Sequence, residues 1–152
     1  MTKKYLEAIE EFVAEKKIAV VGVSRTPNKF GNYIFKALLK KGYHVLPVNP
    51  QMEKIFDYQC YPNLRSLPDK VGGAVVVVNP PRAEEVVKDA HSAGIPRVWL
   101  QQGSESAASV KFCRDHGIPV ISGECILMFA HPVGFLHRIH RFFWNIFHRI
   151  NQ

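Results

Sequence analysis

Residues 17–50 read KIAVVGVSRTPNKFGNYIFKALLKKGYHVLPVNP and show the clearest structural pattern in the chain. The apolar, β-branched run at 18–23 predicts a strand that is buried on both faces of a parallel sheet. After a turn, a helix is expected from an N-cap at Asn28 to about residue 41, where Gly42 ends it. A second strand is expected at 43–48. This unit places a helix N-terminus at the carboxyl edge of the sheet, where α/β folds bind phosphorylated ligands.

The rest of the chain repeats this alternation of apolar strands and amphipathic helices. We expect helices at about 2–16, 80–93 and 104–116, and strands at about 57–60, 73–78, 96–101 and 118–121. Thr2 and Ser104 are the expected N-caps of the first and last of these helices. The pattern predicts an α/β fold with a doubly wound, mainly parallel sheet of about five strands and helices on both faces.

Length and composition are those of one globular domain. The chain has 152 residues, of which 47% are hydrophobic and 22% are charged. Its three cysteines lie far apart without a CxxC pair, which favours a reducing, cytoplasmic location over a disulfide framework or a zinc site. We expect neither a signal peptide, because the opening segment carries acids, nor a membrane span, because no apolar run reaches about 18 residues. The net charge of +7 favours anionic partners, whether phosphates, nucleic acid or acidic lipids.

Residues 131–152 show a different pattern from the domain that we expect at 1–130. Their apolar residues follow helical spacing: Phe135, Leu136, Ile139, Phe142, Phe143, Ile146, Phe147 and Ile150. The other positions are rich in arginine and histidine, and the segment contains no acid, which predicts a basic amphipathic C-terminal helix. Two interpretations stay open. The apolar stripe packs on this domain or on a second copy in a homodimer, or the helix lies on a membrane surface.

Polar and basic residues gather in the loops that follow the predicted strands, and these loops meet at one edge of the sheet. Gly22 and Ser24 match part of a GxGxxG pattern, in which Gly22 permits close approach of the backbone to a pyrophosphate. A glycine after a strand is equally common in a simple turn. Arg25 and Lys29 would supply countercharge to a phosphate, or lie in solvent as ordinary loop residues.

The end of the second predicted strand bears on the choice of nucleotide. NAD-binding folds place an acidic residue there to bind the ribose hydroxyls. Here Asn49 and Pro50 occupy that position, and the first acid is Glu53. The missing carboxylate argues against NAD and favours a ribose that carries a phosphate.

No set of residues stands out as catalytic. His44, His91 and His116 are scattered along the chain, and we interpret Cys125 as a small buried hydrophobe rather than a nucleophile. The pair at 101–102, two glutamines at the exit of a predicted strand, either hydrogen-bonds a ligand amide or is simply polar loop.

Five motifs occur in order along the chain: VVGVSRTPNKFGN, VLPVNP, VVVVNPP, VWLQQG and GIPVISGECILM. Together they resemble the small stand-alone CoA-binding domain proteins, which are similar to the N-terminal domain of the succinyl-CoA synthetase α subunit. The likeness covers about residues 8–130 and implies a Rossmann-like fold that binds coenzyme A. Two departures from the family pattern are Asp57, where glycine is usual, and the pair at 123–124, where a more polar, basic pair is usual.

The resemblance also implies where each site residue would lie. Around the CoA phosphates would be Gly22, Val23, Ser24, Arg25 and Lys29, and near the adenosine end Asn49 and Pro50. Beside the nucleotide would be Asn79 and Pro80, and toward the pantetheine arm Gln101, Gln102 and Gly103.

The leading interpretation is therefore a non-catalytic CoA or acyl-CoA binding protein without a nucleic acid partner. The phosphohistidine of the synthetase lies in a second domain outside the resemblance, so catalysis of that kind is not implied. One alternative is an NADP-linked oxidoreductase on the same fold. Another is an adaptor that acts on a membrane or a protein partner through the C-terminal helix.

Overall fold

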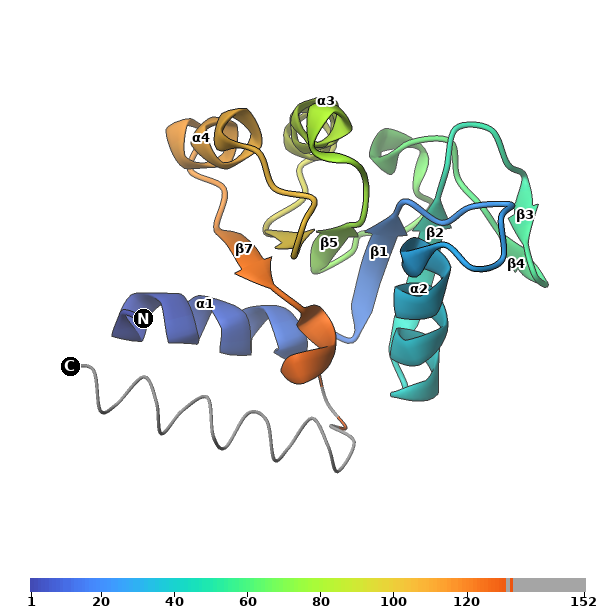
Figure 1. Cartoon of the computed structure of the whole chain (residues 1–152), viewed down its shortest axis with the longest axis horizontal. Helices are drawn as coiled ribbons and strands as arrows, with labels where there is room; N and C mark the ends of the chain where they lie inside the picture. The colour runs from blue at the N-terminus through green and yellow to red at the C-terminus, as the bar shows by residue number, and fades with distance from the viewer. Residues whose placement is uncertain (131, 133–152) are drawn as a thin grey trace.

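A computed structural model describes residues 1–130 and 132, and its centre is a parallel five-stranded sheet (Figure 1). The strands lie in the order β2-β1-β5-β6-β7. Their bounds are Lys17–Val21 for β1, His44–Val48 for β2, Gly73–Val76 for β5, Val98–Gln101 for β6 and Val120–Glu124 for β7. The predicted Rossmann-like fold with about five parallel strands is confirmed.

Helices cover both faces of the sheet, as Figure 1 shows. The helices α1 (Lys3–Ala14) and α2 (Phe30–Lys40) lie on one face, and α3 (Pro80–Ser92) and α4 (Ala107–Asp115) on the other. Side chains alternate along each strand, so Ile18 and Val20 pack toward the first pair of helices while Ala19 and Val21 pack toward the second. This two-sided burial explains why the strands read as continuous apolar runs.

The order of the strands fixes where the sheet can open. The chain passes from β1 through α2 to β2 on one side of β1, and later returns to β5 on the other side. The connections after β1 and β5 therefore leave in opposite directions. In open α/β sheets, ligands bind in the crevice at this kind of switch point, outside the carboxyl ends of the strands.

A short antiparallel hairpin lies beyond β2 at the edge of the molecule (Figure 1). The strand expected at 57–60 is observed as β4 (Tyr58–Gln59), which pairs with β3 (Lys54–Ile55). The turn between them places Phe56 at a φ of 52°, in the left-handed region. Beyond the hairpin, Tyr61 bonds to the backbone of the β2 exit on both sides, which shields this edge of the sheet.

Several predicted element ends were displaced by hydrogen bonds that the sequence does not display. Asn28 lies inside a turn closed by the N–H of Lys29 and the carbonyl of Thr26, so Lys29 is the N-cap of α2. The N-cap of α4 is Ser106, which forms a capping box with Ser109. The predicted cap Ser104 instead accepts a bond from the N–H of Val78, 3.1 Å away.

The last strand is also shifted, because the N–H of Ile118 bonds to the carbonyl of Cys113 and closes the end of α4. The strand therefore begins at Val120 and continues to Glu124, rather than spanning 118–121. The predicted C-terminal helix at 131–152 lies outside the described residues. Within the described part of the chain, no helix has the length and apolar character needed to cross a membrane.

Candidate functional site

A polar cleft of about 450 Å³ opens at the carboxyl edge of the sheet, at the switch point between β1 and β5. Its walls come from the β1–α2 loop, the β2 exit, the start of α3 and the loop after β6. Most of the residues predicted from the sequence to contact the ligand line this cleft: Gly22, Val23, Ser24, Lys29, Asn49, Pro50, Asn79, Gln102 and Gly103. The structure thus brings together segments that are far apart in the chain.

Three of the predicted ligand-contact residues do not line this cleft. Arg25 is exposed, and its guanidinium donates a bond of 2.6 Å to the carbonyl of Gln51, a residue of the cleft wall. Pro80 is the exposed first residue of α3. Gln101 is only 1% exposed, and its side-chain oxygen accepts a bond of 3.1 Å from the N–H of Ile126. Gln101 therefore ties the end of β6 to the segment that follows β7.

The floor of the cleft is built from backbone in close contact. Gly22 has a φ of +116°, and a Cβ atom at this residue would lie 1.9 Å from the carbonyl oxygen of Val77. A Cβ atom at Gly31 would lie 2.1 Å from the carbonyl oxygen of Gly22. Close packing of the protein against itself is thus enough to require Gly22, whatever approaches from outside.

A buried asparagine holds the β1–α2 loop in shape. The side-chain oxygen of Asn32 accepts a bond of 2.8 Å from the N–H of Ser24. Its amide group donates to the carbonyls of Ser24, at 2.7 Å, and Thr26, at 3.1 Å. Sequence reasoning missed Asn32, although a polar residue among the apolar positions of a helix is a recognisable signal for such a role.

A second asparagine joins the loops after β1 and β2. The amide group of Asn49 donates a bond of 2.6 Å to the carbonyl of Val23, and its oxygen accepts one of 2.8 Å from the N–H of Gln51. The Arg25–Gln51 bond crosses between the same two loops. Together these contacts make one continuous wall from two separate loops.

The charge of the cleft is positive. Its charged lining residues are Lys29 and Arg82, and no carboxylate lines it among residues 1–130 and 132. Neither cation forms an ion pair with another residue in those ranges. Arg82 was not predicted from the sequence. A cation in the first turn of a helix that follows a strand can be recognised as a candidate ligand contact once the start of that helix is known. An unpaired cation pair in a polar cleft suits an anionic ligand.

Internal hydrogen bonds tie β7 to β6 and to α1. The indole N–H of Trp99 donates to the carbonyl of Glu124 at 2.9 Å, and the hydroxyl of Tyr5 donates to the carbonyl of Ser122, also at 2.9 Å. Burial raises the pKa of Tyr5, against a smaller opposing effect of the Ser122 bond. The hydroxyl therefore stays protonated at neutral pH, as a hydrogen-bond donor must.

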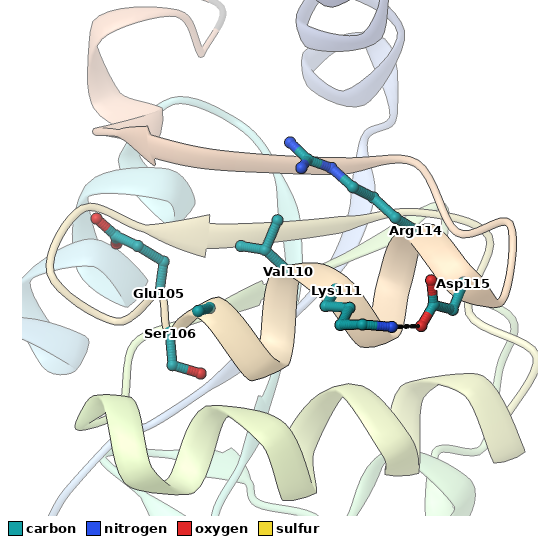
Figure 2. A pocket seen from close by; sticks show the side chains of 7 residues that line it. Glu105, Ser106, Val110, Lys111, Arg114 and Asp115 are labelled. Atoms are coloured by element: carbon teal, nitrogen blue, oxygen red, sulfur yellow. Dashed lines mark hydrogen bonds and ion pairs between the residues drawn. The ribbon is translucent and has the colours of Figure 1, made fainter.

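A further hollow of about 460 Å³ lies on the outer face of α4, seen in Figure 2. An ion pair between Lys111 and Asp115, one turn apart, marks one end of it, and Arg114 and Glu105 stand at its sides. Its walls come from one helix and the residues just before it, and its charges are mixed. It shares no residue with the polar cleft, so we do not assign it to the same site.

Two of the histidines that lie far apart in the sequence are neighbours in space. The rings of His91 and His116 have centroids 4.7 Å apart, with Phe112 stacked on His116. They lie near the C-terminal ends of α3 and α4, and therefore at the opposite edge of the sheet from the cleft. Within residues 1–130 and 132, no three His, Cys, Asp or Glu side chains are grouped to hold a metal ion.

Comparison with known proteins gives consistent results. Residues 16–131 match the family model described as CoA binding domain. An uncharacterized protein of Bacillus subtilis, YneT, is 30% identical over 122 residues, which cover 78% of this chain and 87% of YneT. A conserved hypothetical protein of Pyrococcus furiosus has a solved structure that is 43% identical, with a TM-score of 0.70 over 73% of this chain and 96% of that chain.

A longer enzyme contains a similar segment. The ADP-forming acetate–CoA ligase II of Archaeoglobus fulgidus is 37% identical over 117 residues, which cover 69% of this chain and 17% of the ligase. Because the family model matches most of its length and its fold is shared with solved relatives, this chain belongs to the CoA binding domain family, the succinyl-CoA synthetase-like domain that ADP-forming acetate–CoA ligases also contain.

Proposed function

We propose that this protein binds coenzyme A or an acyl-CoA in the polar cleft and does not itself transform the ligand. The observation that carries the proposal is a cleft at the switch point of the sheet that presents Lys29 and Arg82 and lacks a lining carboxylate among the described residues. Membership of the CoA binding domain family supports CoA as the anion.

The phosphates of the ligand are expected to meet side chains and the first turn of α2. The N–H groups of Ser24 and Thr26 already bond within the loop, to Asn32 and to the Ser24 hydroxyl, so they are not free to cradle a phosphate. The positive N-terminus of α2 and the ammonium group of Lys29 remain. Arg82 contributes a bidentate donor from the opposite wall.

The β2 exit supports a phosphorylated ribose rather than the free diol of NAD. Asn49 stands where a ribose-binding acid would be, and both ends of its side chain bond to neighbouring backbone. Arg25 lies beside it, held on the carbonyl of Gln51. We therefore expect affinity to depend on the 3′-phosphate of CoA, and both NAD and dephospho-CoA to bind more weakly.

The absence of catalysis is proposed from the chemistry of the walls. Among the described residues, the cleft lining contains no His, Cys, Asp or Glu that could act as a base or as a strong nucleophile. Cys125 is half-buried and packs at the edge of the core beneath α1 and α2 rather than in the cleft wall. The ligase activity named for the Archaeoglobus relative belongs to a much longer protein.

The test is ligand-dependent stability of the purified chain. CoA and acetyl-CoA at 100 times their dissociation constant should each add about 2.7 kcal/mol to the free energy of unfolding. Dephospho-CoA, NAD and NADP at the same concentration serve as comparisons. Stabilisation by NADP but not by CoA would overturn the proposal.

Matched arginine variants localise the ligand. Arg82→Ala should weaken CoA binding by about 1.5–3 kcal/mol, the contribution of a hydrogen bond to a charged group. Arg114→Ala is the control, because it removes an exposed arginine from the outer face of α4 (Figure 2). Equal loss in both variants would mean that CoA responds to net charge and not to this cleft.

A further inference from the structure

Two large aromatic side chains stand exposed beside the mouth of the cleft. Phe30 is 48% exposed and Tyr33 is 58% exposed, both on the first turns of α2. Their rings are stacked, with centroids 5.9 Å apart and planes 19° from parallel. An exposed aromatic pair of this kind is a candidate for ligand contact.

This aromatic pair lines a second hollow that continues from the cleft. The hollow has a volume of about 500 Å³ and shares two wall residues, Lys29 and Phe30, with the polar cleft. Phe30 therefore stands on the boundary between them. A ligand that fills the cleft and extends past Phe30 enters the second hollow directly.

The chemistry of the second hollow is aromatic and cationic. Among the described residues, its charged wall residues are Lys29 and Lys36, and none of its wall residues is acidic. The ammonium group of Lys36 lies 4.2 Å from the centre of the Phe56 ring, which holds the cation at the rim. Aromatic faces bind nucleobases by stacking, and lysines beside them bind phosphates.

We infer that Phe30 and Tyr33 form the stacking platform for the adenine of the CoA ligand, with Lys29 on the side of the polar cleft and Lys36 at the outer rim. The inference rests on the proposed function and adds the residues that select the nucleotide end. A second copy of the chain fits this face less well, because a two-fold contact would bring the same lysines together, and the described wall residues include no acid to pair them.

The experiment measures dissociation constants of the full chain by isothermal titration calorimetry with three compounds. They are CoA, adenosine 3′,5′-bisphosphate as its nucleotide end, and 4′-phosphopantetheine as its other end. Phe30→Ala should weaken both CoA and the bisphosphate by about 5-fold to 100-fold and leave 4′-phosphopantetheine unchanged. Phe30→Tyr, which keeps a stacking face, should restore most of the affinity.

Tyr58→Ala is the matched control, because Tyr58 is also exposed, at 44%, and lies on the hairpin outside both hollows. Tyr33→Ala repeats the test at the more exposed ring and serves if Phe30→Ala does not fold. Unchanged CoA affinity in both platform variants overturns the inference and leaves the proposed function intact. Loss confined to 4′-phosphopantetheine also overturns it, since the platform then holds the pantetheine end. Failure of the wild-type chain to bind CoA overturns the proposed function itself.

Discussion

The two halves of the sheet's carboxyl edge use similar residues in opposite ways. At the exits of β1, β2 and β5, polar groups and cations surround an open cleft. Within β6 and at the end of β7, the polar groups turn inward, although the loop after β6 still lines the cleft: Gln101 bonds to Ile126, and Trp99 bonds to the carbonyl of Glu124. A polar residue at a strand exit is therefore available to a ligand only where the protein's own main chain has not already bonded to it.

The largest effect that tests this comparison is expected at Gly22. Gly22→Ala would place a methyl group 1.9 Å from the carbonyl oxygen of Val77, and should reduce the free energy of unfolding by more than about 3 kcal/mol. Gly103→Ala is the matched control, since Gly103 also has a positive φ, of +90°, but has open space around it. Its cost should be about 1–2 kcal/mol, from backbone strain alone. Urea denaturation measures both, and equal losses would contradict the steric explanation.

Asn32 should give the next largest effect. Asn32→Asp keeps the size of the side chain and the acceptor for Ser24, but it loses both donors and places a carboxylate against the carbonyls of Ser24 and Thr26. We expect a loss of about 2–3 kcal/mol in the free energy of unfolding and weaker CoA binding. Ser24→Ala, which removes only the hydroxyl that accepts from Thr26, should cost less. Denaturation together with CoA titration separates the two variants, and an unchanged Asn32→Asp protein would show that the loop holds its shape without this clamp.

The two neighbouring glutamines compare the open and closed halves directly. Gln101→Leu leaves the N–H of Ile126 without its partner and should reduce the free energy of unfolding by about 1–3 kcal/mol. Gln102→Leu changes an exposed side chain on the cleft wall, so its stability should stay within about 0.5 kcal/mol while CoA binding weakens. Thermal melts with and without CoA give both quantities. If Gln101→Leu weakened CoA binding and Gln102→Leu reduced stability instead, Gln101 rather than Gln102 would face the ligand.

The smallest effect concerns the thiols. Burial raises the pKa of Cys113 from its ordinary value of 9.0 to about 11, while Cys125 beside the β7 exit is only half-buried. Iodoacetamide at neutral pH should therefore modify Cys125 well before Cys113, as followed by mass spectrometry. Because the folded state keeps the Cys113 proton more tightly, this group's contribution to stability is complete below pH 9 and is lost as the pH rises through about 11. Simultaneous modification would show that α4, which carries Cys113, detaches readily from the sheet.

Local patterns were enough to predict the architecture but not the assignment of each polar residue. The alternation of buried runs with amphipathic helices gave the sheet, its parallel sense and the edge where the loops gather. The fate of Gln101 depended on Ile126, 25 residues away, and that of Ser104 on Val78, 26 residues away. Such bonds join elements that are far apart in the sequence, and no local pattern marks them. The sequence therefore cannot show which polar groups at the ends of strands are already hydrogen-bonded.

Arg82 and Asn32 were missed for a different reason. Each lies inside a predicted helix, where periodicity assigns positions to a face without giving the direction in which a particular side chain reaches. Arg82 reaches the cleft because α3 begins directly at the strand exit. Asn32 turns back across its own helix N-terminus to the preceding loop. Both roles depend on where the helix starts, which is the least certain feature of a sequence-based assignment.

The bonds from Asn32, Asn49 and Arg25 that join the β1 and β2 loops also have a kinetic consequence. Because the loops are already tied to each other, an arriving ligand has little backbone to immobilise and no closure to wait for. Association should then proceed in one step, with an observed rate that rises linearly with ligand concentration. Differences in affinity among related thioesters would appear almost entirely in how long each one stays bound.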